Sequence, residues 1–140
     1  SAMLVCDQQK ADQLNIPIEA RLLGYAGAAT DPEWFTIAPV QAMKNLSEKL
    51  SLPLDKVDLF EISEAFSVVP MVAMKELGLD HAKVNAFGGA VAIGHPLGAT
   101  GARIVDTLAR GLKQTGGRIG IACLCIGGGE ATAIAIERVH

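Results

Sequence analysis

Stretches with the hydrophobic spacing of a helix alternate along this chain with short apolar or alternating runs typical of strands. The predicted helices cover residues 8–14, 39–50, 64–77 and 100–114. The predicted strands cover residues 2–6, 18–29, 57–62, 84–87, 118–126 and 131–138. Because helices and strands alternate throughout, the pattern predicts an α/β fold with a mixed, mostly parallel sheet and an antiparallel C-terminal hairpin at its edge.

Capping and helix-breaking residues set the expected bounds of the helices. Asp7 and Ser63 are placed to cap the first and third predicted helices through their side-chain oxygens. Pro39 suits the first turn of the second helix. Pro70 removes a hydrogen bond from the third, so we expect a kink there or two shorter helices, with Gly78 as the exit.

Length and composition fit one domain over residues 1–140. Half of the residues are apolar, and the chain has only one Trp, one Tyr and four Phe, so the core is expected to consist mainly of Ala, Val, Ile and Leu. The first predicted strand begins at once, with nothing leading into it. We therefore expect this strand to be truncated and a further part of the protein to lie upstream.

The charge pattern argues against nucleic acid and membrane lipid as partners. The formal net charge is −3, and the 12 Lys and Arg residues are scattered without a basic run. The apolar runs are too short and too interrupted by glycine to cross a bilayer, and the start does not resemble a secretory leader.

The three cysteines have no zinc-type spacing, so we predict no metal site. Cys123 and Cys125 lie two apart on one predicted strand, where a disulfide would be strained. A reducing compartment, the cytoplasm or an organelle matrix, is therefore expected.

A glycine-rich stretch around His95 carries the first chemical signal. His95 lies between Gly94 and Pro96, directly ahead of a helix that begins with small residues. Imidazole exchanges a proton near neutral pH, and its N–H can stabilise an oxyanion. Small residues also let a ligand approach the helix N-terminus, whose dipole favours negative charge. The same local sequence fits equally well a loop histidine without a chemical role.

Cys125 carries the second signal, because it ends a predicted buried strand and is followed by Ile126 and the glycines 127–129. Backbone N–H groups in such a turn can point at one oxyanion. A thiol there can act as a nucleophile or as an acid and base if a nearby imidazole lowers its pKa. Cys6 and Cys123 fit small core residues, and for Cys125 the local sequence leaves both interpretations open.

Ser63 places a hydroxyl between a predicted strand and a predicted helix, where a plain N-cap is sufficient explanation. Three common site motifs are excluded. In the stretch 94–101, Ala99 follows Gly98 where a phosphate loop has Lys, and no Gly-x-Gly-x-x-Gly follows the first strand. No serine lies in a Gly-x-Ser-x-Gly elbow.

Three blocks in this order resemble the C-terminal domain of the thiolase family, the acetyl-CoA acetyltransferase type in particular. They are Ser63-Glu64-Ala65-Phe66, Gly94-His95-Pro96 with Gly98-Ala99-Thr100-Gly101, and Cys125-Ile126-Gly127-Gly128-Gly129, and the resemblance covers essentially all 140 residues. It implies a layered, thiolase-like fold with helices on both faces of the sheet. The implied activity is acyltransfer by Claisen condensation: acetyl-CoA and an acyl-CoA give a 3-oxoacyl-CoA and coenzyme A, or the reverse, as in fatty acid metabolism. Coenzyme A thioesters are then substrates, and no cofactor is implied.

The resemblance also implies residue roles. His95 matches the histidine that activates the nucleophilic cysteine and helps to form an oxyanion hole for the thioester oxygen of acetyl-CoA. Cys125 matches the second cysteine, which takes a proton from the acetyl methyl group in synthesis and returns one in cleavage. Four positions match residues near the substrate: Ala65, Phe66 and Ile126 near the pantetheine end, and Gly127, whose N–H belongs to a second oxyanion hole.

The chain differs from the family pattern at two points, and both change the activity that we expect of it. The family block is Asn-Glu-Ala-Phe, in which the Asn holds a water; Ser63 takes its place here, and its shorter side chain is expected to shift that water. The nucleophilic cysteine of the N-terminal domain has no counterpart, because Cys6 does not match its motif. The resemblance therefore predicts a C-terminal half that is inactive alone, requires an N-terminal half or subunit, and forms a homo-oligomer when complete.

Two alternatives compete with this hypothesis. A non-catalytic acyl-CoA-binding or assembly domain derived from a thiolase would keep the motifs by descent. A ketoacyl synthase of the same superfamily is disfavoured, because those enzymes typically use two His, or His and Asn, where this chain has Cys125.

Overall fold

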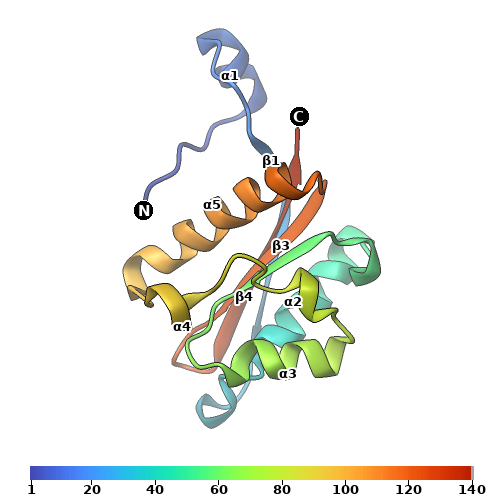
Figure 1. The fold of residues 1–140 in the computed structure, drawn as a ribbon, viewed down its shortest axis with the longest axis vertical. Coiled ribbons are helices and arrows are strands. Elements are labelled where there is room, and N and C mark those ends of the chain that lie inside the picture. The colour runs from blue at the N-terminus through green and yellow to red at the C-terminus, as the bar shows by residue number, and fades with distance from the viewer. Residues whose placement is uncertain (140) are drawn as a thin grey trace.

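The computed structural model describes residues 1–139 and contains one four-stranded sheet with helices packed on it (Figure 1). The strands are β1 (Ala20–Ala29), β2 (Leu59–Ile62), β3 (Ile119–Cys125) and β4 (Glu130–Arg138), and their order in the sheet is β1-β4-β3-β2. The longer helices are α1 (Gln8–Leu14), α2 (Ala38–Leu50), α3 (Val68–Leu77) and α5 (Leu97–Thr115). The short ones are α4 (Ala90–Ile93) and the 3₁₀ turns Pro32–Trp34, Leu54–Lys56 and His81–Lys83.

The mixed α/β class and the final hairpin are confirmed, but parallel pairing is the minority. Only β2 and β3 are parallel, whereas β4 is antiparallel to both β1 and β3. The hairpin therefore lies inside the sheet, and the expected mostly parallel sheet with the hairpin at its edge is wrong. Periodicity identifies strands but does not say which strand lies beside which, and here β1 pairs along the whole free side of β4.

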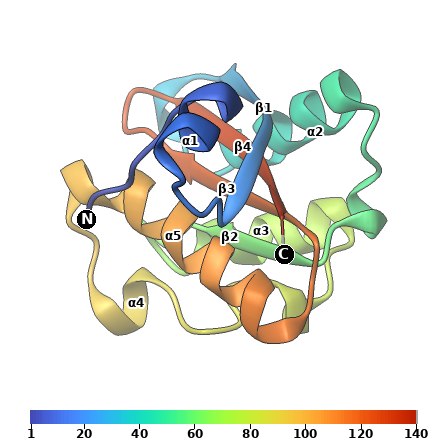
Figure 2. The same cartoon turned by 90° about the horizontal axis from the view of Figure 1, so that it is seen from above.

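Helices cover both faces of the sheet, as expected. Successive residues of a strand point to opposite faces. Phe60 of β2 packs in a cluster with α2 and α3, while its neighbour Leu59 packs with α5. The α5 residues that fill the second cluster are Ile104, Leu108 and Leu112. Figure 2 shows α5 and α2 separated by the strands.

The apolar run at residues 2–6 does not form the expected strand. These residues are exposed, and Figure 1 shows that they and α1 extend away from the end of the sheet. A strand needs a neighbour that satisfies its backbone hydrogen bonds. None of the four strands lies beside this run within residues 1–139, so its hydrophobicity alone is insufficient.

The third helix begins later than expected. It starts at Val68 rather than at residue 64, so Ser63 is not its cap. Pro70 then falls in the first turn, where its missing N–H costs no helical hydrogen bond, and no kink is needed. The helices expected over 8–14 and 39–50 are confirmed, while the one expected over 100–114 begins earlier, at Leu97. Asp7 accepts from Lys10 N–H at 2.7 Å and Gly78 ends α3 in the left-handed conformation, as expected.

The predicted strand over residues 84–87 reduces to one bridge, between Val84 and Phe60. Asn85 has a positive φ of 48°, which turns the chain out of the strand direction. Its side chain instead caps the end of β2, accepting from Ile62 N–H at 2.8 Å and donating to Ile62 O at 2.9 Å.

Candidate active site

Ser63 and Cys125 lie at the same edge of the sheet because they follow or end two neighbouring parallel strands. Ile62 of β2 stands opposite Cys123 of β3. Directly after β2, Ser63 N–H donates to Cys123 O at 2.8 Å. The carboxyl ends of parallel strands are a common place for reactive groups, since loops can converge there.

His95 is joined to the same edge through the start of α5. A Cβ placed on Gly101 would lie 3.7 Å from Leu124 Cδ2, so the first turns of α5 pack against the end of β3. The His95 ring is held to that part of the helix, because its Nδ1 lies 2.7 Å from Thr100 Oγ1. The loop that carries His95 therefore leads into a helix that packs on the end of β3, on the face that Leu124 occupies, whereas Cys125 packs against the cluster on the other face.

A carboxylate ties the block after β2 to the loop that leads to His95. Glu64 Oε1 accepts from Asn85 Nδ2 at 2.8 Å, and Glu64 Oε2 accepts from Val91 N–H at 2.8 Å. Gly89 makes this approach possible, because a Cβ there would overlap the Glu64 carboxylate. We call these residues, Glu64, Asn85, Gly89 and Val91, the Glu64 latch.

The Glu64 latch is not predicted from the sequence, because the pattern places Glu64 in the first turn of a helix. The available signal was the position of Glu64 inside a block with two other candidate residues. A second signal was Asn85, which follows an apolar residue and precedes two glycines. Neither signal says that the two side chains meet, since 20 residues separate them along the chain.

Cys125 is a half-buried free thiol, and burial raises its pKa above the usual range. Cys123 is fully buried beside Pro39 O, with its Sγ 3.8 Å away, and burial raises its pKa as well. The expectation of a core role for Cys123 is confirmed. Cys6 is exposed, so the expectation that it lies in the core is wrong.

Ser63 is 1% exposed, and its Oγ has no hydrogen-bond partner within residues 1–139. Buried hydroxyls usually have a partner, so the unpaired Ser63 hydroxyl is an exception within the described residues. The interpretation of Ser63 as a plain N-cap is wrong, because α3 begins five residues later.

Two glycines of the turn between β3 and β4 differ in their surroundings. Gly129 lies where only glycine fits, and Gly127 is exposed. Gly129 has a φ of 100°, and a Cβ there would overlap the Thr30 carbonyl. Ile126 N–H donates to Glu130 O at 2.7 Å and closes the turn. Gly127 is exposed, and a Cβ on it would meet nothing within 4 Å, so its backbone is accessible.

The positions predicted near the pantetheine end are accessible. Phe66 is 61% exposed and packs edge-on against Phe35, with ring centroids 6.2 Å apart. Ile126 is 46% exposed, and Ala65 is partly buried. The structure thus brings the segments 63–66, 85–95 and 125–127 to one edge of the sheet, while the roles of the individual side chains stay predictions.

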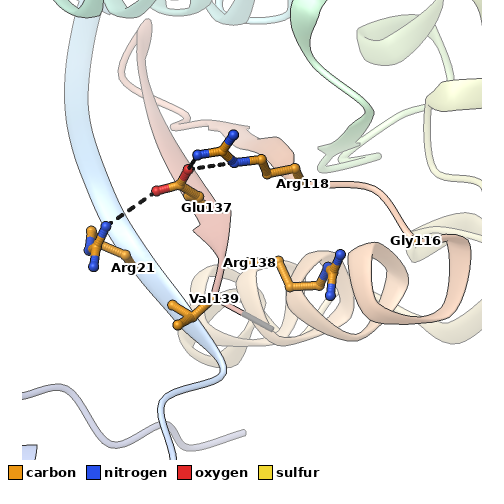
Figure 3. Close-up of a pocket in the computed structure, with 6 residues that line it drawn as sticks. All are labelled: Arg21, Gly116, Arg118, Glu137, Arg138 and Val139. Carbon is orange, nitrogen blue, oxygen red and sulfur yellow. Dashed lines mark hydrogen bonds and ion pairs between the residues drawn. The ribbon is translucent and has the colours of Figure 1, made fainter.

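A hollow of about 520 Å³ lies at the opposite end of β3, away from these residues (Figure 3). Its charged groups bind one another: Glu137 Oε1 accepts from Arg118 Nη2 at 2.6 Å, and Arg21 Nη1 lies 3.5 Å from Glu137 Oε2. Arg138 Nε donates to Gly117 O at 2.7 Å. We interpret it as a surface network of ion pairs rather than as the active site. Its lining residues are Arg21, Gly116, Arg118, Glu137, Arg138 and Val139.

Neither a metal-binding cluster nor a membrane-spanning helix occurs in the described part of the chain. Over residues 1–139, no group of three or more His, Cys, Asp or Glu side chains is close enough to hold a metal ion. No helix in the same range is both long and apolar enough to span a bilayer.

Comparison with known proteins agrees with this geometry. Residues 16–138 match the family described as "Thiolase, C-terminal domain". The acetyl-CoA acetyltransferase of Yarrowia lipolytica is 48% identical over 139 residues, which are 99% of this chain and 34% of that protein. The chain thus spans about a third of the length of the curated relatives it matches.

Solved structures give the same result. The acetyl-CoA acetyltransferase of Bacillus anthracis matches with a TM-score of 0.91 and 42% identity, covering 94% of this chain and 34% of that one. The Acat5 thiolase of Ascaris suum, solved in complex with coenzyme A, matches with a TM-score of 0.89 and 44% identity, covering 95% of this chain and 34% of that one.

Proposed function

The chain belongs to the thiolase family as its C-terminal domain, and from this premise we propose that it supplies His95, Cys125 and Ser63 to a thiolase active site. The observation that supports the proposal is that segments 63–66 and 125–127 lie where two neighbouring parallel strands end, while the loop that leads to His95 is hydrogen-bonded to Glu64. The proposed reaction is acyl transfer between coenzyme A thioesters. The relatives' names and the coenzyme A complex of the Ascaris suum thiolase support this substrate class.

In the proposed first half-reaction, a nucleophilic cysteine outside these 140 residues attacks the thioester of an acyl-CoA. His95 takes the proton of that cysteine, and the C–S bond to coenzyme A breaks. The departing thiolate takes a proton from solvent and leaves as coenzyme A, while His95 keeps the proton of the cysteine, so the enzyme retains the acyl group as a new thioester.

In the proposed second half-reaction, the Cys125 thiolate removes a proton from the methyl group of acetyl-CoA. A carbon acid is too weak for an unaided thiolate, so the enolate oxygen must be stabilised as the proton leaves. His95 N–H and a water held by Ser63 Oγ are the proposed donors. The carbanion then attacks the acyl-enzyme carbonyl, and the nucleophilic cysteine departs as 3-oxoacyl-CoA forms.

The pKa of the Cys125 thiol is raised in this chain, so the rest of the enzyme must lower it for the thiol to act as a base. A base must be ionised at the working pH, whereas burial here favours the neutral thiol. We propose that an N-terminal half or subunit completes the site and lowers this pKa. The complete enzyme is proposed to be a homo-oligomer that uses coenzyme A thioesters and no other cofactor. Its proposed place is a reducing compartment, the cytoplasm or an organelle matrix, because the three cysteines are free.

The test joins the N-terminal two thirds of the Bacillus anthracis relative to this chain in one polypeptide. We expect the 140-residue chain alone to show no acetoacetyl-CoA cleavage and the fusion to show turnover. Cys125→Ala in the fusion should abolish turnover, because it removes the proposed base. Cys123→Ala, two residues earlier on the same strand, is the matched control and should keep most of the activity, since Cys123 is a core residue.

Two outcomes contradict the proposal. Turnover by the 140-residue chain alone, lost on Cys125→Ala, requires a one-domain mechanism. A folded fusion that binds coenzyme A but does not turn over favours the second candidate, a non-catalytic acyl-CoA-binding or assembly domain. The observation that favours this second candidate is that Ser63 stands where the family has Asn.

A further inference from the structure

We infer that Thr100 is a positioning residue: its buried hydroxyl holds neutral His95 in the tautomer with the proton on Nδ1, which leaves the Nε2 lone pair free to accept a proton. The tautomer is inferred from the contacts of the Thr100 hydroxyl with His95 and Pro96. Its catalytic consequence rests on the proposed function, in which His95 takes a proton from a thiol.

The contacts of the Thr100 hydroxyl determine which way its proton points. Thr100 is 2% exposed, so its Oγ1 exchanges few hydrogen bonds with water. Oγ1 lies 2.7 Å from His95 Nδ1 and donates to Pro96 O at 3.1 Å. A hydroxyl has one proton to donate and two lone pairs that accept. With its proton on Pro96 O, it can only accept from His95, which requires Nδ1–H.

The Pro96 carbonyl is a fixed acceptor. It also accepts from Ala99 N–H at 2.8 Å and from Thr100 N–H at 3.0 Å, within the first turn of α5. Threonine in a helix commonly donates to the carbonyl four residues earlier, and its branched Cβ limits the alternatives. The hydroxyl is therefore oriented by its own helix rather than by the histidine.

The opposite arrangement makes fewer hydrogen bonds. If Thr100 donated to His95 Nδ1, its hydroxyl would no longer donate to Pro96 O. The buried oxygen would then accept no hydrogen bond from His95. In the proposed arrangement, the Thr100 hydroxyl accepts a hydrogen bond from His95 Nδ1–H and donates one to Pro96 O. A buried hydrogen bond is worth about 1 kcal/mol net, and this difference favours one tautomer severalfold.

This orientation suits both proposed tasks of His95. The neutral ring presents Nε2 as an acceptor for a thiol proton. Once Nε2 is protonated, Nδ1–H continues to donate to Thr100, so no neighbouring group has to turn. Nε2–H is then available to an oxyanion.

The tautomer is measured directly by ¹⁵N NMR of the imidazole in the 140-residue chain, at a pH where the ring is neutral. His95→Gln assigns the signal against His81 and His140. We expect wild type to show Nδ1–H, Thr100→Ser to retain it, and Thr100→Val to shift the population towards Nε2–H. Wild type with Nε2–H, or Thr100→Val without any shift, overturns the inference. Amide spectra of each variant report whether the fold is kept, and Thr100→Ser tests the hydroxyl if Thr100→Val does not fold.

The catalytic consequence is measured in the fusion enzyme. Thr100→Val should lower kcat/KM roughly tenfold, and Thr100→Ser should restore most of it, because an imidazole in the wrong tautomer cannot take the proton. Full activity of a folded Thr100→Val fusion overturns the catalytic part. If every fusion lacks activity, the proposed function fails while the NMR result still decides the tautomer.

Discussion

Glu61 is a carboxylate on the buried face of the sheet, where few polar groups surround it. It is 3% exposed on β2, beneath α5, and Arg103 Nη1 lies 3.7 Å from its Oε2. The Arg103 guanidinium has no hydrogen-bond partner within residues 1–139. Burial raises the pKa of Glu61 to about 7, although Arg103 opposes this rise and the charge of Glu64 adds to it. A buried pair without further hydrogen bonds does not recover its full desolvation cost.

This carboxylate makes stability depend on pH in an unusual direction. The pKa of Glu61 is about 7 in the folded protein and 4.5 in the unfolded chain, so the folded state binds the proton more tightly between these values. The stabilising contribution of the protonated Glu61 side chain to the free energy of unfolding is fully present below pH 4.5 and is lost as pH rises through 7. We expect Glu61 to lower the free energy of unfolding by about 3 kcal/mol between pH 4.5 and 8.

Glu61→Gln should flatten this decline, because glutamine keeps the size and does not titrate. Urea unfolding at several pH values between 5 and 8 measures it. The exposed Glu48→Gln is the matched control and should keep the wild-type slope. Equal slopes for wild type and Glu61→Gln would show that Glu61 is ionised throughout this range.

At the scale of elements, the Glu64 latch explains how a loop becomes part of a site. Within the described residues, the segment from Val84 to Val91 has only one bridge to the sheet, and yet four hydrogen bonds of Asn85 and Glu64 hold it to the end of β2. The loop reaches His95 from this fixed point, and Thr100 holds the ring at the far side. The loop position is therefore set by side chains rather than by secondary structure.

Gly89→Ala should disrupt this element, because the new Cβ would overlap the Glu64 carboxylate, which then has to leave Val91 N–H. We expect a loss of about 1–3 kcal/mol in the free energy of unfolding, together with faster hydrogen exchange at the Val91 amide. Gly98→Ala is the matched control: a Cβ there meets nothing within 4 Å, and alanine favours the helix. Unchanged exchange at Val91 in Gly89→Ala would show that the latch does not hold the loop.

At the scale of the whole molecule, several large apolar side chains of the site segments are exposed. They lie on the start of α3, on the loop before α5 and on the turn after β3: Phe66, Met71, Phe87, Val91, Ile93, Leu97 and Ile126. The same segments carry the predicted catalytic residues. This exposure agrees with a chain that spans a third of its relatives, since the proposed N-terminal half would have an apolar surface to cover.

Cysteine labelling tests whether the reactivity of Cys125 depends on the proposed N-terminal half. In the 140-residue chain at pH 7.5, iodoacetamide should modify exposed Cys6 fastest, half-buried Cys125 more slowly and buried Cys123 slowest. In the fusion, Cys125 should react faster than in the chain alone if the completed site favours its thiolate. An equally slow Cys125 in both would favour the non-catalytic domain. The rate of Cys123 is the internal control for unfolding.

Local sequence was sufficient for most elements of this fold. The spacing of Met43 and Leu46 in α2, and of Ile104, Leu108 and Leu112 in α5, follows the buried face of each helix, because a helix must turn its apolar side to the sheet. The runs on either side of Gly127–Gly129 predicted the hairpin. The three sequence blocks also predicted the family, which the match over residues 16–138 confirms.

The amino-acid sequence by itself therefore determined which segments are helices and strands, and the family to which they belong. Only the tertiary structure decided that β4 lies between β1 and β3, that Ser63 is a buried hydroxyl and not a cap, and which side chains hold Glu64 and His95. The physical reason is that periodicity is set by neighbours along the chain. Strand order and hydrogen-bond partners instead depend on groups that meet only when distant segments pack together.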